Sequence, residues 1–175
     1  MYLMLIIFLV LLAYFVFFVS QFYNVFFKGY APFISTDRET IKTILAASSI
    51  STPFIVYELG CGRARFLRIA EKIFPGLRLI GVENLASLYY LNWLRLKLSF
   101  SKIQLWKKDF LALNLQDADL IYCYLNNDTM KKLGDKFSKE CRGGTQIVSR
   151  SFPIPQFIPE KVLNVKNKKI YFYKI

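Results

Sequence analysis

Histidine is absent from this chain of 175 residues. Its absence excludes catalytic triads that depend on histidine and most zinc sites. Cysteine is scarce, with Cys61, Cys123 and Cys141 scattered along the sequence. Cysteines in this arrangement do not form a metal cluster, so we expect no bound metal. They favour free thiols in a reducing compartment over a disulfide framework.

Charged side chains are absent from residues 1–27. Tyr2 to Val19 is apolar throughout and comes close to the ~20 residues that a helix needs to cross a bilayer. A cleaved signal peptide would need a basic start and small residues at its cleavage site, and the segment has neither. We therefore predict a transmembrane anchor over residues 1–27 and a second domain over residues 28–175. An unusually apolar core helix is the alternative to the anchor.

The distribution of basic residues predicts the orientation and the partners. Lys28, Arg38 and Lys42 follow the apolar segment and no basic residue precedes it, which predicts a single-pass membrane protein with a cytoplasmic C-terminal domain. Acidic residues are few, with 12 Asp and Glu against 24 Lys and Arg. This excess favours anionic partners, and we expect a lipid surface because a tethered domain always has headgroups beside it. Nucleic acid is disfavoured because no RNA-binding signature of glycine and aromatic residues is present.

Short β-branched and aromatic runs alternate with helical segments from residue 53 onward. Alternation of this kind predicts an α/β domain with a parallel sheet and helices on both faces. The expected strands lie within residues 53–59, 78–83, 102–109, 117–125 and 144–149, and the named helices are 64–74 and 85–98. Two further runs, 159–165 and 168–175, predict an antiparallel hairpin that closes the sheet. A capped helix is expected over 36–47, with Thr36 or Asp37 as its N-cap.

The stretch YELGCGRARF, residues 57–66, runs from a strand end through two glycines into a helix. Gly60 and Gly62 stand where the backbone turns tightly and approaches a ligand, and the helix that follows offers unpaired N–H groups. A dinucleotide fingerprint would require a glycine at position 65, which is Arg65. The remaining pattern makes Glu58, Gly60, Cys61 and Gly62 candidate ligand-binding residues.

Two further acidic residues end the next two predicted strands. Glu83 follows Gly62 by 21 residues and is placed to accept hydrogen bonds from both hydroxyls of a ribose. Asp109 ends the third strand, within reach of an adenine amino group. A glycine loop, a ribose-binding acid and an adenine-binding acid in this order predict a site for an adenosine-bearing ligand at the carboxyl ends of the strands.

These residues resemble a known family. The motif ELGCG at 58–62, followed by Glu83 and by KKDF at 107–110, is similar to the class I S-adenosylmethionine-dependent methyltransferases, whose fold has a Rossmann-like, seven-stranded sheet. Three further stretches, APFIST at 31–36, DADLIYCYLNN at 117–127 and GTQIVSRSFPIP at 144–155, resemble the small membrane-anchored protein-lysine methyltransferases. The mitochondrial members of that family modify the ATP synthase c subunit and the adenine nucleotide translocase, and prokaryotic relatives exist. The resemblance implies S-adenosylmethionine as cofactor and a protein substrate at or in the membrane.

The resemblance also implies roles for residues around the methyl group. Tyr122, Tyr124 and Asn126 lie on or just past the fourth strand, where their oxygens can orient an amine for an in-line displacement. Their alternative role, for the two tyrosines, is packing beneath a helix. The substrate-binding residues that the resemblance implies are Tyr30, Phe33, Thr36, Phe152 and Pro153.

The glycine loop departs from the family pattern at Arg63 and Ala64, which replace an acid and a third glycine. An alanine fits at position 64 if the backbone there is helical, but a positive φ would cost about 1 kcal/mol or more. The Ser-His-Asp-Phe-Pro pattern of the family is here Ser149 to Pro153 with Arg150 and Ser151 in the middle. An RNA or small-molecule methyltransferase and a non-catalytic interaction module therefore remain alternatives to the lysine methyltransferase.

Overall fold

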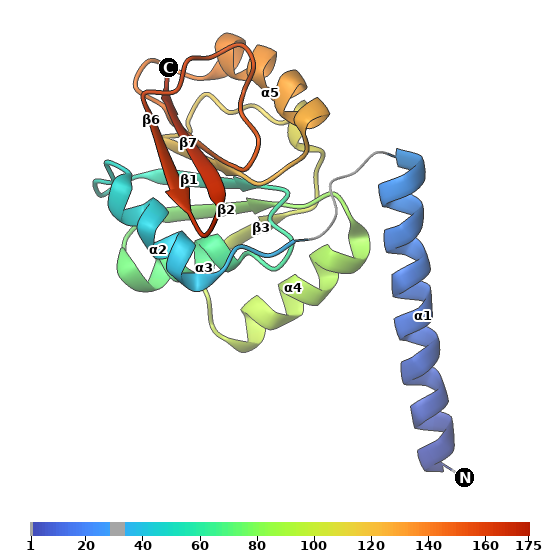
Figure 1. Ribbon diagram of the computed structural model, residues 1–175. Helices are drawn as coiled ribbons and strands as arrows, with labels where there is room; N and C mark the ends of the chain where they lie inside the picture. Colours follow the sequence, from blue (N-terminus) through green and yellow to red (C-terminus); the bar gives the residue numbers. More distant parts are fainter. Residues whose placement is uncertain (1, 29–33) are drawn as a thin grey trace. The chain divides into compact units, whose positions relative to one another are not determined.

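The computed structural model describes residues 2–28 and 34–175 and divides into two compact units, Met1–Ile34 and Ser35–Ile175 (Figure 1). The first unit contains helix α1, Tyr2–Lys28. Its segment Tyr2–Val19 has a mean hydropathy of 2.9, and none of it is buried. This helix is long and apolar enough to cross a membrane, a property that it shares with N-terminal signal sequences.

The second unit is built on a seven-stranded sheet of order β3-β2-β1-β4-β5-β7-β6. The first five strands are parallel, and β7 joins β5 and β6 in antiparallel fashion. The strands are β1 Ile55–Leu59, β2 Arg78–Val82, β3 Gln104–Trp106, β4 Leu120–Cys123, β5 Gln146–Arg150, β6 Lys161–Val165 and β7 Lys168–Lys174. The expected seven-stranded sheet, parallel with a C-terminal antiparallel hairpin, is confirmed.

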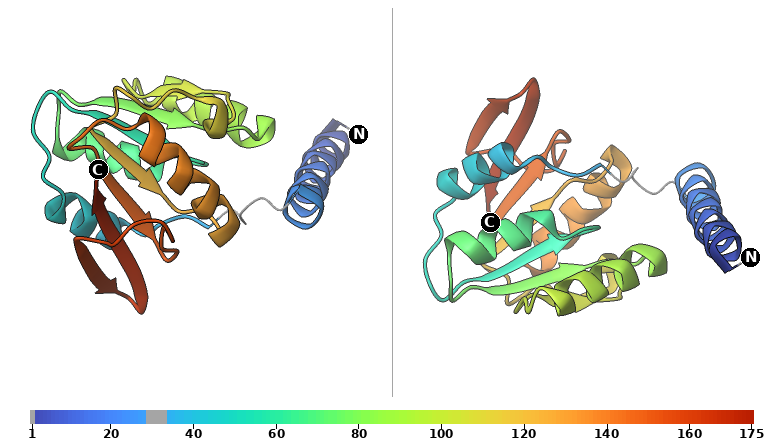
Figure 2. Two further views of the ribbon diagram at one scale, coloured as in Figure 1. Left: turned by 90° about the horizontal axis from the view of Figure 1, so that it is seen from above. Right: turned by 90° about the horizontal axis from the view of Figure 1, so that it is seen from below.

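Helices cover both faces of the sheet (Figures 1 and 2). On one face lie α2, Arg38–Ala47, α3, Arg65–Ile73, and α4, Ala86–Leu98; on the other lies α5, Asn127–Glu140. Side chains from α2, α3 and α4 join those of β1 and β4 in one buried cluster that includes Ile41, Phe66, Leu96, Val56 and Tyr122. Because strand residues alternate between faces, Tyr57 and Cys123 point to the opposite layer.

The C-terminal hairpin agrees with its prediction in detail. Val165 pairs with Lys168, so the turn consists of Lys166 and Asn167, which have φ values of 51° and 60°. Positive φ at both turn residues is the geometry whose twist matches that of the two strands. The short turn positions Lys168 at the start of β7, beside the parallel part of the sheet.

Two elements differ from the expectation. β3 has three residues where the prediction spans 102–109, because Asp109 leaves the sheet and its side chain caps a short 3-10 helix, η1, Phe110–Ala112. None of the predicted elements corresponds to α5. Its buried apolar residues Met130, Leu133 and Phe137 have helical spacing, and this pattern in the sequence could have predicted the helix.

Candidate active site

The candidate site lies where the strand order reverses, between β1 and β4. Ligands of open α/β sheets bind at such a point, outside the carboxyl ends of the strands. The loops after the two strands touch here: a Cβ added to Gly60, whose φ is 69°, would lie 2.8 Å from Cδ2 of Leu125. Glycine is therefore required at position 60 for two reasons: the backbone is left-handed, and the Leu125 side chain leaves no room for a Cβ atom.

The glycine loop is held against β2 by backbone hydrogen bonds. The N–H groups of Gly60 and Cys61 both donate to the carbonyl oxygen of Val82, at 2.9 and 3.0 Å. Gly62 has a φ of 50°, and its N–H donates to Oε2 of Glu83 at 2.9 Å. The loop is thus fixed to the strand end that carries Glu83.

Glu83 is buried, and each of its oxygens accepts one backbone hydrogen bond. Oε1 accepts from the N–H of Leu85 at 2.9 Å, while Oε2 accepts from Gly62. Burial raises the pKa of the Glu83 carboxyl, and these hydrogen bonds oppose the rise. Because a carboxylate oxygen has more than one acceptor position, both oxygens retain capacity for the two hydroxyls of a ribose. The free acceptor positions of Glu83 therefore fit the ribose of an adenosine group.

Glu58 and Cys61 occupy the floor of the loop and are both buried. Burial raises the pKa of the Glu58 carboxyl well above its usual range; a hydrogen bond from Leu67 N–H at 3.4 Å opposes this rise and the charge of Glu83 adds to it. Burial, followed by the charges of Glu58 and Glu83, likewise raises the pKa of the Cys61 thiol. A neutral, buried thiol is a poor nucleophile, which leaves Cys61 a packing and backbone role.

Ala64 has φ 47° and ψ 40°, a left-handed conformation, and it stands at the N-cap position of α3. It is completely buried and makes no side-chain capping bond. The backbone at position 64 therefore has the positive φ that favours glycine. An L-residue such as alanine in this region costs about 1 to 2 kcal/mol.

Tyr122 and Thr36 come together on the α3 side of β4. The two hydroxyl oxygens are 2.7 Å apart, and the Tyr122 ring stacks on Phe66 with centroids 4.2 Å apart and planes 13° apart. Burial raises the pKa of the Tyr122 phenol above its usual value, against the bond to Thr36. Tyr122 therefore packs beneath α3, as the alternative role required, and its hydroxyl also contacts Thr36.

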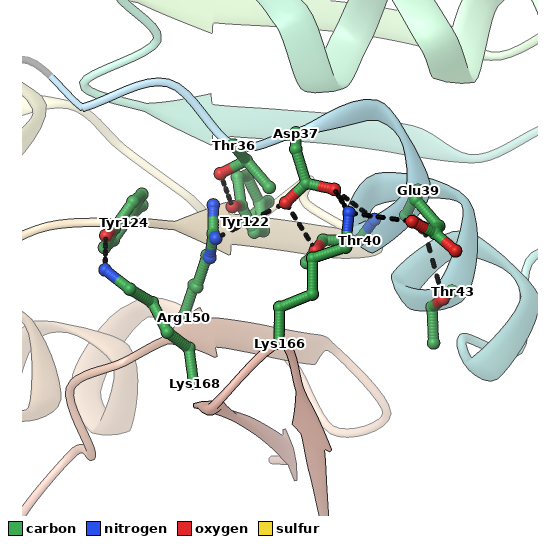
Figure 3. A network of polar contacts seen from close by, with 10 residues as sticks. All are labelled: Thr36, Asp37, Glu39, Thr40, Thr43, Tyr122, Tyr124, Arg150, Lys166 and Lys168. Carbon is green, nitrogen blue, oxygen red and sulfur yellow. Dashed lines mark hydrogen bonds and ion pairs between the residues drawn. The ribbon is translucent and has the colours of Figure 1, made fainter.

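Tyr124 lies just past β4 and is surrounded by cations (Figure 3). Its hydroxyl accepts a hydrogen bond from Nζ of Lys168 at 2.9 Å, and the guanidinium carbon of Arg150 lies 4.8 Å from its ring centroid. Burial acts to raise the pKa of this phenol, but the hydrogen bond from Lys168 and the positive charges of Lys168 and Arg150 outweigh it and lower the pKa.

Arg150 is a functional candidate that sequence reasoning did not select. Its side chain is buried, and Nη2 lies 3.6 Å from Oδ2 of Asp37 (Figure 3). The other oxygen of Asp37, Oδ1, accepts a hydrogen bond from Nζ of Lys166 at 3.0 Å. Within the described residues, Nε and Nη1 of Arg150 have no hydrogen-bond partner. An arginine that directly follows the apolar core of a predicted strand was the available signal, because arginine is rarely buried without a partner.

The other predicted residues lie in varied settings. Oδ1 of Asn126 accepts from the N–H of Thr129 at 2.9 Å and caps α5. Oδ1 of Asp109 accepts from Leu111 N–H at 2.9 Å, and the residue is exposed at the carboxyl end of β3. Phe152 and Pro153 follow β5, where the Phe152 carbonyl accepts from Oγ of Ser149 at 2.5 Å. Tyr30 and Phe33 lie outside the described residues.

Acidic and sulfur side chains do not converge on a metal site. Among residues 2–28 and 34–175, no group of three or more His, Cys, Asp or Glu is arranged to hold a metal ion.

Comparison with known proteins places these features in a family context. Residues 58–161 match the family described as ANTKMT methyltransferase domain. A "Protein-lysine N-methyltransferase" from Saccharolobus islandicus is 26% identical over 159 residues, which cover 83% of this chain and 94% of the relative.

Solved structures share the fold. An RNA methyltransferase from Salinibacter ruber in complex with S-adenosyl-L-homocysteine is 20% identical, with a TM-score of 0.75 over 81% of this chain and 94% of that one. A precorrin-6y C5,15-methyltransferase from Geobacter metallireducens is 14% identical, with a TM-score of 0.64 over 81% of this chain and 89% of that one. At these identities the likeness is one of fold.

Proposed function

Because the chain belongs to the ANTKMT methyltransferase family, we propose that it transfers a methyl group from S-adenosylmethionine to a lysine side chain of a membrane-associated protein. Membership makes the protein a methyltransferase, and S-adenosylmethionine is its cofactor. The lysine acceptor is supported by the archaeal relative, whose alignment covers most of both chains. The contact between Glu83 and the Gly62 amide carries the proposal, since it joins the glycine loop to the ribose-binding acid.

The cofactor would be held by residues at the carboxyl ends of the first three strands. Glu83 would accept from the ribose hydroxyls, Asp109 would accept from the adenine amino group, and Gly60 to Gly62 would border the cofactor with their backbone. Glu58 would support the glycine loop from below, through its hydrogen bond from the Leu67 N–H. When bound, S-adenosylmethionine supplies an electrophilic methyl group on a sulfonium.

The acceptor side belongs to the residues past β4. A lysine amine must lose its proton before transfer, and moving its pKa from ~10.4 to 7 corresponds to about 4 to 5 kcal/mol. Positive charge on Arg150 and Lys168 disfavours a protonated amine nearby, and the Tyr124 hydroxyl oxygen, which accepts from Lys168, offers a further acceptor position to an N–H of the neutral amine. Tyr122 and Asn126 would orient the amine, while Thr36, Phe152 and Pro153, together with Tyr30 and Phe33, would border the substrate.

The membrane part of the proposal rests on the first unit. Tyr2–Val19 would cross the bilayer once. The basic residues that follow it would keep Ser35–Ile175 in the cytoplasm, next to anionic headgroups. A methyl acceptor that is itself in or on the membrane would then be confined to the same membrane surface as the enzyme.

Calorimetric titration of the full chain in detergent with S-adenosylhomocysteine tests the site. The Glu83→Ala variant should bind at least tenfold more weakly, a loss of about 1.4 kcal/mol, because a charge-assisted hydrogen bond to ribose is removed. Glu71→Ala is the matched control, since Glu71 is a carboxylate of the same domain that bonds Ser101 and the Lys102 amide instead. Equal affinity of the wild type and Glu83→Ala would remove the ribose assignment.

The left-handed Ala64 favours one alternative, a non-catalytic module that keeps the fold and has lost the cofactor. Titration of Ala64→Gly beside the wild type separates the two functions. Binding by the wild type supports the enzyme; binding by Ala64→Gly alone would show that the loop has drifted away from catalysis.

A further inference from the structure

Helix α4 is apolar on both of its sides. Leu88, Asn92 and Leu96 face the sheet and are buried. The opposite side carries large exposed side chains, and Phe100, two residues past the helix end, adds to them. We call this set the outer face of α4: Tyr90, Leu91, Trp93, Leu94, Leu98 and Phe100. Leu98 and Phe100 are 73% and 94% exposed. In a domain of this size, the outer side of a surface helix is normally polar.

The segment that carries this face is basic. Residues 86–108 contain no Asp or Glu, and their charged residues are Arg95, Lys97, Lys102, Lys107 and Lys108. Two of these cations lie over aromatic rings of the outer face: Nζ of Lys97 is 5.2 Å from the Trp93 ring centroid, and Nζ of Lys107 is 5.2 Å from that of Tyr90. The outer face is therefore an apolar and aromatic surface rimmed by lysines.

We propose that the outer face of α4 binds an anionic lipid surface, with its leucine and aromatic side chains among the acyl-chain ends and its lysines at the phosphates. Tryptophan and tyrosine favour this depth because their rings are apolar with a polar edge. Lysines extend toward the headgroups while their stems cover apolar surface. The basic character of residues 86–108 matches a negatively charged partner.

This contact is distinct from the span of α1, although it rests on the proposal that the protein acts at a membrane. A helix that crosses the bilayer keeps the domain near the membrane but does not by itself determine which surface of the domain faces the lipid. A second contact through α4 would select that surface and so one orientation of the active site toward membrane-bound substrates.

Tryptophan fluorescence offers a direct test because the chain has two tryptophans, Trp93 and Trp106. The Trp106→Phe variant leaves Trp93 as the sole reporter on the outer face of α4. The Trp93→Phe variant leaves Trp106, whose ring lies 6.0 Å from Tyr57 on the other face of the sheet. Each full-length variant is reconstituted into phosphatidylserine-containing vesicles whose phosphatidylcholine carries bromine on its acyl chains.

Bromine quenches only nearby indoles, so we expect strong quenching of Trp93 and little of Trp106. Adding Lys97→Glu and Lys107→Glu should weaken the interfacial equilibrium of α4 by roughly fivefold or more per side chain and reduce the quenching of Trp93. Lys131→Glu with Lys132→Glu, on α5 across the sheet, makes the same charge change and should leave the quenching unaltered.

Three results would overturn the inference. Quenching of Trp93 as weak as that of Trp106, in a chain that floats with the vesicles, would leave the anchor intact and remove the α4 contact. Quenching of Trp93 that is equally strong in purely zwitterionic vesicles would show that the contact does not require anionic lipid. Protection of Trp93 that grows with protein concentration, without bromine quenching, would assign the outer face to a second copy of the chain.

Discussion

Ala64 is a residue at which two energies oppose each other. Its left-handed backbone costs about 1 to 2 kcal/mol relative to glycine. Its buried methyl group contributes about 0.8 kcal/mol, and a glycine would also have more freedom in the unfolded chain. We therefore expect Ala64→Gly to leave the free energy of unfolding within about 0.5 kcal/mol of the wild type, because relief of strain offsets both losses.

Ala70 provides the control for this substitution. It is equally buried but lies within α3, where glycine brings the two losses and no relief. Ala70→Gly should cost about 1 to 2 kcal/mol in chemical denaturation, so that the difference between the two variants measures the strain at Ala64. Equal destabilisation by both substitutions would show that Ala64 is unstrained.

Glu58 makes the stability of the fold depend on pH. Burial raises the pKa of its carboxyl well above the value in the unfolded chain, so the folded state binds the proton more tightly. This stabilising contribution is fully present below pH ~4.5 and is lost as pH rises through the folded pKa. Glu58→Gln stays neutral, so we expect its melting temperature to match the wild type in acid and to exceed it increasingly toward pH 8. A gap that does not change with pH would contradict the buried, proton-binding carboxyl.

Asp37 joins two elements that the sequence separates. It caps α2 through the Thr40 N–H at 3.0 Å, and its carboxylate also faces Lys166 of the hairpin turn and the buried Arg150. Loss of a cap costs about 1 kcal/mol, within a range of about 0.5 to 2. Asp37→Asn keeps a capping oxygen and removes the charge, whereas Asp37→Ala removes both.

We expect Asp37→Asn to be destabilised as well, because Arg150 then lacks a charged partner, and Asp37→Ala to lose about 1 kcal/mol more than Asp37→Asn in chemical denaturation. Wild-type stability of Asp37→Asn would mean that Asp37 acts on α2 alone. Equal stability of the two variants would assign its whole effect to the charge.

Elements with strong local signals were predicted well. The helices α3 and α4 and the C-terminal hairpin begin and end within a few residues of their expected positions, since hydrophobic period, glycine and turn length are local properties. The capped helix α2 follows Asp37, one of its two expected caps. β3 is shorter than expected because Asp109 bonds the Leu111 amide instead of continuing the strand.

At the scale of the whole molecule, part of the candidate site was predictable from local sequence signals and part depends on the topology of the sheet. Gly62 and Glu83 were expected together, because parallel strands bring their carboxyl ends to one edge, and the structure joins them at 2.9 Å. Tyr124, Arg150 and Lys168 come from the ends of β4, β5 and β7. Their cluster requires β7 to insert between β5 and β6, a topology that no local pattern in the sequence specifies.

Two membrane contacts with different physics lead to a final prediction. An apolar span such as Tyr2–Val19 holds a protein independently of salt, whereas a basic interfacial face is screened by salt. We therefore expect the full chain to stay in the membrane fraction after washes at high salt and alkaline pH and to be released by detergent. The variant without residues 1–27 should bind anionic vesicles at low salt and leave them at high salt. Recovery of the full chain in the soluble fraction without detergent would show that the anchor interpretation is wrong. Salt-resistant binding of the shortened chain would show that the apolar side chains of the outer face of α4, and not its lysines, dominate the contact of the domain with the membrane.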